Sequence, residues 1–295
     1  MSTFEENRGL LTGVAYRILG SMADAEDVVQ EAWLRWSGVD AAGVDDPKAY
    51  LVRITSRLAI DRLRWAKSRR ESYVGPWLPE PVSTAVDVAE QAELSGNVEL
   101  ALLVVLETLS PLERAVFVLR EAFDLPFSEI AEVIGRAEPA TRQLARRARE
   151  HVREKRPRFE ANRAARRRIT ERFISASAEG DLDALIELLS NEVTLVSDGG
   201  GKARAALRTI SGSDHVARYL TSISTPEGIA RFMTSIGVED YSDFSFGMAE
   251  VNGAPAAVVW AAGRAVTAVS LVVVDGRVDT IYLIANPDKL AHLAG

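Results

Sequence analysis

The chain has 295 residues, a hydrophobic fraction of 47% and a formal net charge of −7. This length favours two or three compact units, and the composition is sufficient for hydrophobic cores. There is no cysteine, which excludes disulfides and thiolate metal sites, and the three histidines are dispersed. No apolar run is long enough to span a bilayer and Met1–Gly20 has no basic-then-apolar signal segment, so we expect a cytoplasmic protein without metal or cofactor.

The segment Met22–Trp36 is predicted to be a helix with an acidic outer face. The exposed acidic positions are Asp24, Glu26, Asp27 and Glu31. The predicted inward positions are Val28, Val29, Ala32, Trp33 and Trp36. Because an acidic face repels phosphates, we expect this helix to dock on a protein and not on DNA.

A second, longer helix is predicted from Asp46, with Pro47 at a favourable first position. Its inward positions are Leu51, Ile54, Leu58 and, in one interpretation, Trp65. Its end, Asp61–Arg70, interleaves cations with an indole ring, a pattern suited to a distorted or single DNA strand. The alternative is a core Trp65 surrounded by solvated cations.

The stretch Tyr73–Ala92 contains Pro76, Pro79 and Pro81 and cannot be a continuous helix. It therefore predicts a spacer between two helical domains.

The segment Phe127–Val152 has the pattern of a helix-turn-helix, with Gly135 between its two helices. In the second helix, the inward stripe is Thr141, Leu144, Ala145, Ala148 and Val152. The outward positions are Arg142, Gln143, Arg146, Arg147, Arg149 and Arg153. Such a helix suits a DNA major groove, although a solvated basic helix has the same pattern.

Positive charge is concentrated in this part of the chain. Residues 136–168 carry a net charge of +9, which leaves −16 for the remainder. The acidic remainder opposes attraction to phosphates, so we expect the chain to need a protein partner to engage DNA.

The last third changes pattern and predicts an α+β unit. Helices are expected at Ile169–Ser177 and Leu182–Leu189, followed by a curved antiparallel sheet. Strands are predicted at Glu192–Val196, Ala256–Ala262, Thr267–Val274 and Val278–Ala285. Asn252-Gly253 and Asp275-Gly276 are predicted hairpin turns.

Three separated segments, Ala23–Trp36, Asp61–Arg64 and Phe127–Ala131 with Arg147–Arg149, resemble in order and spacing an extracytoplasmic-function RNA polymerase sigma factor. The resemblance implies two all-α sigma domains and two partners, the bacterial RNA polymerase core enzyme and promoter DNA. It assigns core binding to Asp24, Glu26, Asp27, Gln30, Glu31 and Arg35. It assigns the −10 element to Arg57, Arg62, Arg64, Trp65 and Arg69, and the −35 element to Arg142, Gln143, Arg146 and Arg147.

Two details qualify the −10 assignment. The loop Gly38–Asp46 is implied to help hold a flipped-out base. Arg57, however, occupies a position where many relatives have asparagine, so the −10 sequence preference does not carry over directly.

The C-terminal third resembles the cone-shaped, SnoaL-like superfamily, and three motifs resemble those of the SigJ-type subgroup of these sigma factors. The motifs are Trp77, Leu78, Pro79, Glu80 and Pro81; Asp198, Gly199, Gly200, Gly201 and Lys202; and Asn286, Pro287, Asp288, Lys289 and Leu290. The resemblance implies that the fused domain regulates the sigma domains in cis, with the sign of control open. The expected domains are 1–72, a Pro-containing linker 73–93, 94–158 and the SnoaL-like domain 159–295.

Alternatives remain for the C-terminal domain. It could bind a small-molecule ligand, or act as an enzyme with Asp198, Asp214 or His215 as general base, although their spacing fixes no shared geometry. The glycine run lacks the spacing of a P-loop. The whole chain could also be a free-standing helix-turn-helix regulator with a sensing or enzymatic domain; we expect a sigma factor that is not an enzyme.

Overall fold

The structure is a computed structural model that describes residues 3–40, 43–84, 99–155 and 162–293. The described chain divides into two compact units. The first contains residues 3–71 and 102–155, and the second contains residues 72–84, 99–101 and 162–293, each range taken without the undescribed positions. The predicted boundaries at 93/94 and 158/159, and residues 85–92 of the predicted spacer, lie outside the described residues. In the described ranges, no helix combines the length and the apolar character needed to cross a bilayer.

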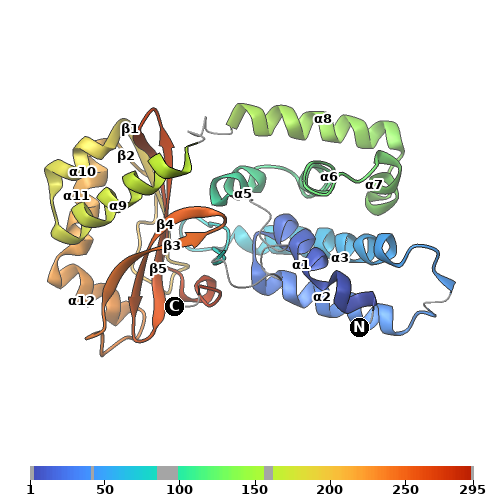
Figure 1. The fold of residues 1–295 in the computed structure, drawn as a ribbon, viewed down its shortest axis with the longest axis horizontal. Coiled ribbons are helices and arrows are strands. Elements are labelled where there is room, and N and C mark those ends of the chain that lie inside the picture. The colour runs from blue at the N-terminus through green and yellow to red at the C-terminus, as the bar shows by residue number, and fades with distance from the viewer. Residues whose placement is uncertain (1–2, 41–42, 85–98, 156–161, 294–295) are drawn as a thin grey trace. The chain divides into compact units, whose positions relative to one another are not determined.

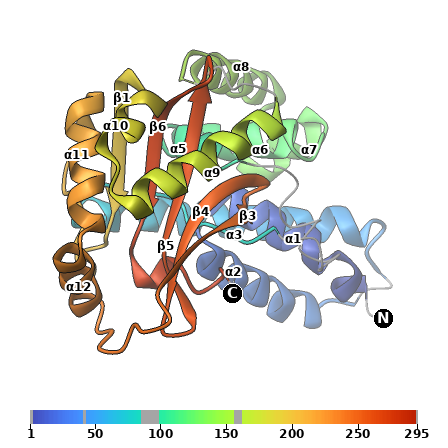
Figure 2. The same cartoon turned by 60° about the vertical axis from the view of Figure 1, so that its left-hand side comes forward.

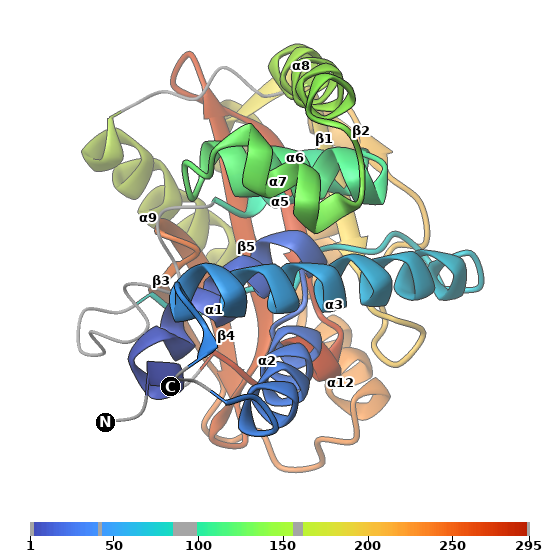
Figure 3. The same ribbon diagram turned by 90° about the vertical axis from the view of Figure 1, so that its right-hand side faces the viewer.

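The first unit begins with helices α1 (Thr3–Leu19), α2 (Met22–Ser37) and α3 (Pro47–Arg70), which pack together (Figure 3). Local sequence explains where two of them begin. The Ser21 side chain accepts the Asp24 N–H at the start of α2, and Asp46 accepts the Ala49 N–H at the start of α3. The predicted helix start at Asp46 is therefore confirmed.

Two tryptophans differ from the predicted inward orientation. Trp33 is 45% exposed, because it lies at the edge of the buried stripe of α2, which runs through Ala25, Val29, Ala32 and Trp36. Trp65 is 52% exposed near the end of α3. The interpretation of Trp65 as a core residue is therefore wrong.

The first unit continues with α5 (Leu100–Glu107), whose first two residues belong to the second unit, and with α6 (Pro111–Glu121), α7 (Phe127–Ile134) and α8 (Glu138–Lys155). Gly135 ends α7 in the left-handed conformation, with φ of 65°, which favours glycine. The predicted stripe on α8 is buried, with Leu144 half-buried, while its arginines are exposed. The helix-turn-helix prediction is confirmed at the level of fold.

The second unit is an α+β structure in which helices cover one face of a curved sheet (Figures 1 and 2). Its helices are α9 (Arg163–Glu179), α10 (Leu182–Leu188), α11 (Ser213–Ser224) and α12 (Pro226–Ser235). Its strands are β1 (Leu189–Asp198), β2 (Ile210–Ser211), β3 (Ser245–Val251), β4 (Ala254–Ala261), β5 (Arg264–Val274) and β6 (Arg277–Ile284). The short helix η2 (Pro287–Lys289) follows.

The sheet has the strand order β2-β1-β6-β5-β4-β3. Strands β1 and β6 are parallel, so the prediction of a purely antiparallel sheet is wrong. The prediction that all helices precede the sheet is also wrong, because α11 and α12 lie between β2 and β3 in the chain. A parallel pair needs a long connection between its strands, and residues 199–276 supply it.

Both predicted hairpin turns are confirmed. Asn252 and Gly253 have φ of 52° and 73°, and Asp275 and Gly276 have φ of 49° and 74°. Two successive positive φ angles suit the right-handed twist of paired strands, which explains the Asn-Gly and Asp-Gly sequences. The resulting sheet packs its concave face on helical residues that include Phe173, Leu185 and Leu220.

Candidate functional site

A polar site forms where the parallel strands β1 and β6 end side by side. Asp198, the last residue of β1, lies opposite Ile284 in the register of β6. The Asp198 carbonyl accepts the N–H groups of Ala285 and Asn286, at 2.8 and 3.0 Å. The chain then enters η2, which brings Lys289 to the Asp198 carboxylate. The parallel pairing therefore joins two motifs that are about 90 residues apart in sequence.

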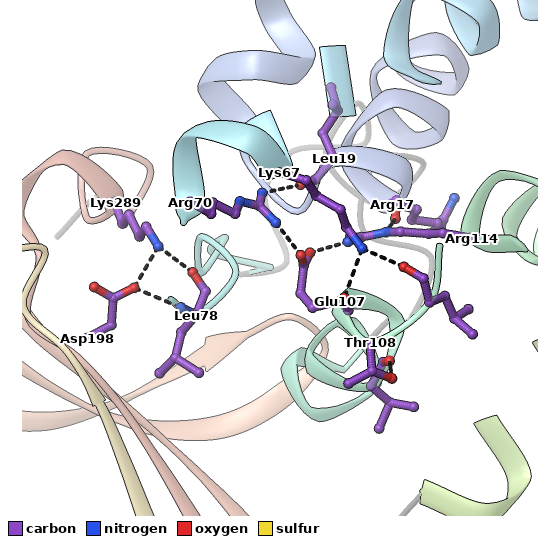
Figure 4. A network of polar contacts seen from close by, with 12 residues as sticks. Arg17, Leu19, Lys67, Arg70, Leu78, Glu107, Thr108, Arg114, Asp198 and Lys289 are labelled. Carbon is purple, nitrogen blue, oxygen red and sulfur yellow. Dashed lines mark hydrogen bonds and ion pairs between the residues drawn. The ribbon is translucent and has the colours of Figure 1, made fainter. Parts of the chain in front are cut away.

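The spacer docks on this carboxylate (Figure 4). Asp198 Oδ2 accepts the Leu78 N–H at 2.8 Å and the Lys289 ammonium at 2.6 Å, and Oδ1 accepts the Tyr73 hydroxyl at 2.6 Å. Lys289 Nζ also donates to the Leu78 carbonyl at 2.5 Å. Asp198 is completely buried and Lys289 is 8% exposed, so each charge depends on the partners named here. We call Tyr73, Leu78, Asp198, Asn286 and Lys289 the linker-docking site.

Aromatic rings of the spacer complete the surroundings of the lysine. Lys289 Nζ lies 4.0 Å from the centre of the Trp77 ring and 5.1 Å from that of Tyr73. Asn286 Nδ2 donates to the Tyr73 hydroxyl oxygen at 2.9 Å. Burial, together with the hydrogen bond to Asp198, raises the pKa of Tyr73, which keeps the hydroxyl protonated as a donor at neutral pH.

The glycine loop, residues Gly199–Lys202, lies against the same spacer. A Cβ atom on Gly200 would lie 2.3 Å from Asn286 Nδ2 and 3.0 Å from the Tyr73 hydroxyl. A Cβ on Gly201 would lie 3.2 Å from the Val74 side chain. These glycines, both with positive φ, therefore permit a close approach of the loop to the spacer. Lys202, in contrast, forms an exposed ion pair with Asp288 at 2.6 Å.

The rest of the spacer continues along the second unit. Glu80 is 2% exposed and its Oε1 lies 2.6 Å from His292 Nδ1. The Val82 N–H donates to Asn252 Oδ1 at 3.2 Å, and the Asn252 N–H donates to the Val82 carbonyl at 2.9 Å. Leu78, Pro79 and Pro81 are buried. The structure thus brings the three predicted motifs together.

Sequence reasoning missed several participants in this contact, among them Tyr73, Asn252 and His292. Tyr73 lies at the start of the proline-containing stretch, but nothing in the sequence indicates a buried partner for it. Asn252 was assigned to a hairpin turn, and that role did not indicate a contact with the spacer. His292 had no local signal, since its partner Glu80 is 212 residues away.

In the first unit, the predicted core-binding face is exposed on α2 and is partly engaged by α3. Arg62 donates to Asp24 and Asp27, each at 2.9 Å, and these bonds raise the arginine pKa against the opposing effect of burial. Glu31 pairs with Arg35 at 2.7 Å, while Glu26 and Gln30 are exposed. Arg62, predicted to bind DNA, is therefore joined by salt bridges to residues that are predicted to bind core polymerase.

The end of α3 presents an aromatic ring between two cations. The guanidinium carbons of Arg69 and Arg62 lie 4.7 and 5.3 Å from the centre of the exposed Trp65 ring. Arg64 pairs with Asp61 at 2.8 Å. An exposed indole flanked by arginines is a surface on which a nucleic-acid base can stack.

Arg57, predicted to face the −10 element, forms hydrogen bonds within the first unit. Its guanidinium donates to the carbonyls of Glu132 and Val133 at 2.7 and 3.3 Å. Neighbouring Arg53 pairs with Glu132 at 3.0 Å. Because these carbonyls lie at the C-terminal end of α7, Arg57 satisfies groups that the helix leaves without internal partners. Helix α3 thereby contacts the helix-turn-helix.

A buried charge cluster forms a second connection between α3 and the later helices (Figure 4). The Glu107 carboxylate pairs with Arg70 of α3 and with Arg114 of α6. Arg114 is completely buried and also donates to the Arg17 carbonyl at 3.1 Å. Lys67 donates to the carbonyls of Glu107 and Leu109, and burial lowers its pKa. No sequence motif indicated this cluster.

The predicted −35 residues lie on the exposed face of α8. Arg142 pairs with Glu138 and lies 4.7 Å from the centre of the Phe127 ring. Arg146 pairs with Glu150 at 2.9 Å, Arg147 lies 3.5 Å from Glu113, and Gln143 is exposed. Ion pairs of this kind are weak at an exposed surface, so phosphates or base edges can replace them.

The second unit also contains an apolar cavity of about 500 Å³ beneath α9, α11 and α12. None of the candidate catalytic residues Asp198, Asp214 and His215 is among the described residues that line it. Asp214 pairs with Arg218 at 2.9 Å, and His215 Nδ1 lies 3.2 Å from the Ser211 carbonyl. Across the described part of the chain, no three His, Cys, Asp or Glu side chains are grouped to hold a metal ion.

An acidic helix beside a helix with an aromatic and basic end, followed by a helix-turn-helix, is the arrangement expected of an RNA polymerase sigma factor; here it precedes an α+β domain. The family model Sigma-70 region 2 matches residues 3–69, and the model Sigma-70, region 4 matches residues 99–152. The chain is 40% identical to the ECF RNA polymerase sigma factor SigJ of Mycobacterium tuberculosis, over 98% of this chain and 92% of the relative. The chain therefore belongs to the extracytoplasmic-function sigma factors, in the SigJ-type subgroup.

Two further comparisons agree. The crystal structure of Mycobacterium tuberculosis SigJ matches with a TM-score of 0.77 and 38% identity, over 98% of this chain and 97% of that one. The probable ECF RNA polymerase sigma factor SigI of the same species is 40% identical over 64% of this chain and 66% of its own length. The SigJ match includes the C-terminal domain, which the two sigma family models leave unmatched.

Proposed function

We propose that this sigma factor directs the bacterial RNA polymerase core enzyme to promoters in the cytoplasm and is regulated in cis by its C-terminal domain. The single observation that carries the regulatory part is the buried Asp198 carboxylate, two of whose bonds come from the spacer residues Tyr73 and Leu78. A buried carboxylate that loses such partners is costly, so docking of the spacer is strongly favoured.

We assign a function to each domain from the residues that it exposes. Residues 1–72 bind core polymerase and the −10 element, residues 73–93 are the linker, residues 94–158 bind the −35 element and residues 159–295 regulate. The proposed core-binding surface is the acidic face of α2, with Glu26, Gln30 and Glu31 exposed. The proposed DNA contacts are the Trp65 ring with its flanking arginines and the outer face of α8.

The proposed control is an equilibrium between a closed and an open state of the sigma domains. In the closed state Arg57 bonds the end of α7, and the Glu107 cluster joins α3 to the later helices. A bipartite promoter requires the −10 and −35 surfaces to contact separate DNA sites, so these contacts must open or rearrange. Docking of residues 73–84 restricts the tether that follows α3, and a bias of a few kcal/mol is enough to shift the populations.

For the C-terminal domain we propose ligand binding without catalysis. The cavity is lined largely by apolar side chains, and the candidate bases Asp198, Asp214 and His215 are engaged elsewhere. General acid–base catalysis needs a titratable group within hydrogen-bonding reach of the substrate, whereas binding needs only a shaped cavity.

The test is run-off transcription with purified bacterial core polymerase on a promoter library, using the full chain and a version ending near residue 158. We expect promoter-specific transcripts that depend on this protein, and a change in their amount when the C-terminal domain is removed. Absence of transcripts from either folded version would favour a free-standing DNA-binding regulator. Equal transcription from both would contradict regulation in cis.

A further inference from the structure

The cavity of the second unit has the size and lining of a small-molecule site. Its volume of about 500 Å³ lies within the range of roughly 300–1,000 Å³ that is typical of ligand pockets. Aromatic side chains form much of its wall: Phe173, Tyr219, Phe232, Phe244 and Phe246. Flat rings in the wall favour an aromatic ligand body, which can pack against them face to edge.

Two cations belong to the lining of the cavity. Arg204 and Arg231 line it and are exposed, whereas its described lining includes no acidic side chain. A guanidinium group matches a carboxylate in shape and can donate two parallel hydrogen bonds. We propose that this cavity binds a small aromatic carboxylate, with the ring system among the phenylalanines and the carboxylate at Arg204 or Arg231.

The cavity wall is continuous with the glycine loop that touches the spacer. Arg204 and Ala205, which follow this loop in sequence, belong to the wall. The turn is tightly closed, because a Cβ on Gly199 would lie 2.4 Å from the Ala203 carbonyl oxygen and 2.8 Å from Ala205 Cβ. Movement of Ala205 therefore displaces the loop whose next glycines contact Tyr73 and Val74.

The geometry of the cavity and the glycine loop indicates that a bound ligand favours docking of the spacer. The cavity has its open, lined form in the structure in which the spacer is docked, and Arg204 and Ala205 are held by the closed loop. A ligand that contacts these two residues binds this form better than one with a displaced loop, and so stabilises docking. The regulatory meaning of this coupling rests on the proposed role of the linker.

Binding is tested by calorimetry on the full chain with 2-naphthoate and its uncharged analogue 2-naphthamide. We expect saturable binding with preference for the carboxylate, and in Arg204→Ala a loss of carboxylate affinity of up to about fivefold, the range of an exposed charge pair. Arg208→Ala, an exposed arginine of the same segment outside the cavity lining, is the matched control.

Val259→Phe supplies the second variant, because it fills the cavity from the sheet side and should abolish binding of both compounds. Absence of saturable binding to the natural chain, or equal binding to Val259→Phe with its fold intact, would overturn the site. Equal carboxylate affinity in the Arg204→Ala and natural chains, together with equal affinity for the amide, would overturn the proposed ligand class.

Coupling is measured by amide hydrogen exchange at Leu78 and Val82, whose N–H groups donate across the docked contact. We expect exchange there to slow at saturating 2-naphthoate. Unchanged or faster exchange with binding intact would overturn the coupling. This readout does not depend on polymerase, so its failure is distinguishable from failure of the sigma function, which appears only as missing run-off transcripts.

Discussion

Lys289 and Asp198 form a buried ion pair, with Nζ and Oδ2 separated by 2.6 Å and side-chain exposures of 10% and 0%. Both groups also bond the backbone of Leu78, so the pair has a partner from the spacer for each charge. A buried pair of this kind stabilises only when its remaining hydrogen-bonding capacity is satisfied. Docking of the spacer adds a backbone hydrogen bond to each member of the pair.

Asp198→Asn is expected to weaken docking and to lower the free energy of unfolding of the second unit by about 3 kcal/mol, because Lys289 then lacks a buried counter-charge. Urea unfolding measures the stability, and amide exchange at Leu78 measures docking. Asp288→Asn is the matched control, since the Lys202–Asp288 pair is exposed and worth less than about 1 kcal/mol. Similar losses in both variants would contradict a special role for the buried pair.

Gly200→Ala is expected to impair docking more than its backbone strain alone would. The residue has φ of 60°, and a Cβ would overlap Asn286 and approach Tyr73. The comparison is Gly276→Ala, which has φ of 74° and no atom within 4 Å of its Cβ. Strain of about 1 kcal/mol is common to both, and overpacking adds roughly 1–3 kcal/mol only at Gly200. Equal unfolding free energies of the two variants would show that the glycine loop accommodates the added methyl group without overpacking.

Glu107→Gln is expected to destabilise the first unit by about 3 kcal/mol, because it leaves the fully buried Arg114 without its carboxylate. Chemical unfolding followed by circular dichroism measures this loss. Glu31→Gln is the control, because Glu31 forms an exposed pair with Arg35. A loss below about 1 kcal/mol at Glu107 would mean that water reaches the cluster and replaces the pair.

Arg57→Ala is expected to shift the sigma domains toward the open state by removing two hydrogen bonds to the end of α7, worth roughly 1–3 kcal/mol together. The chain has no cysteine. A variant that combines Ser68→Cys with Gln143→Cys therefore takes spin labels at these two positions and nowhere else. Their measured distance distribution should broaden or lengthen. Arg53→Ala, which removes an exposed pair with Glu132, should change it less.

Arg146→Ala is expected to relax promoter preference at one or two positions of the −35 element, at a cost of about 1–3 kcal/mol if the arginine contacts a base edge. Competition transcription from a promoter library measures the preference. Arg149→Ala is the comparison, since Arg149 pairs with Glu121 at 2.7 Å and should affect all sequences alike. A uniform loss in Arg146→Ala would reassign that residue to phosphate contact.

Local sequence determined several of the helices, the two predicted hairpin turns and the helix-turn-helix. The cap at Asp46, the left-handed Gly135 and the Asn252-Gly253 and Asp275-Gly276 turns depend on contacts within a few residues, so their signals are visible in the sequence. The burial stripe of α8 followed from the same helical periodicity. Trp33 was the error of this approach, because periodicity does not fix how wide the buried stripe is.

The tertiary structure alone decided how distant polar groups combine. The parallel pairing of β1 with β6 placed Lys289 on Asp198, and the spacer completed the site with Tyr73 and Leu78, more than 110 residues before Asp198 in the chain. The same holds for Arg57 on the end of α7 and for the Glu107 cluster. A charged residue has the same local signal whether it is solvated or buried in a pair, so the sequence could name the motifs but could not show which partners satisfy them.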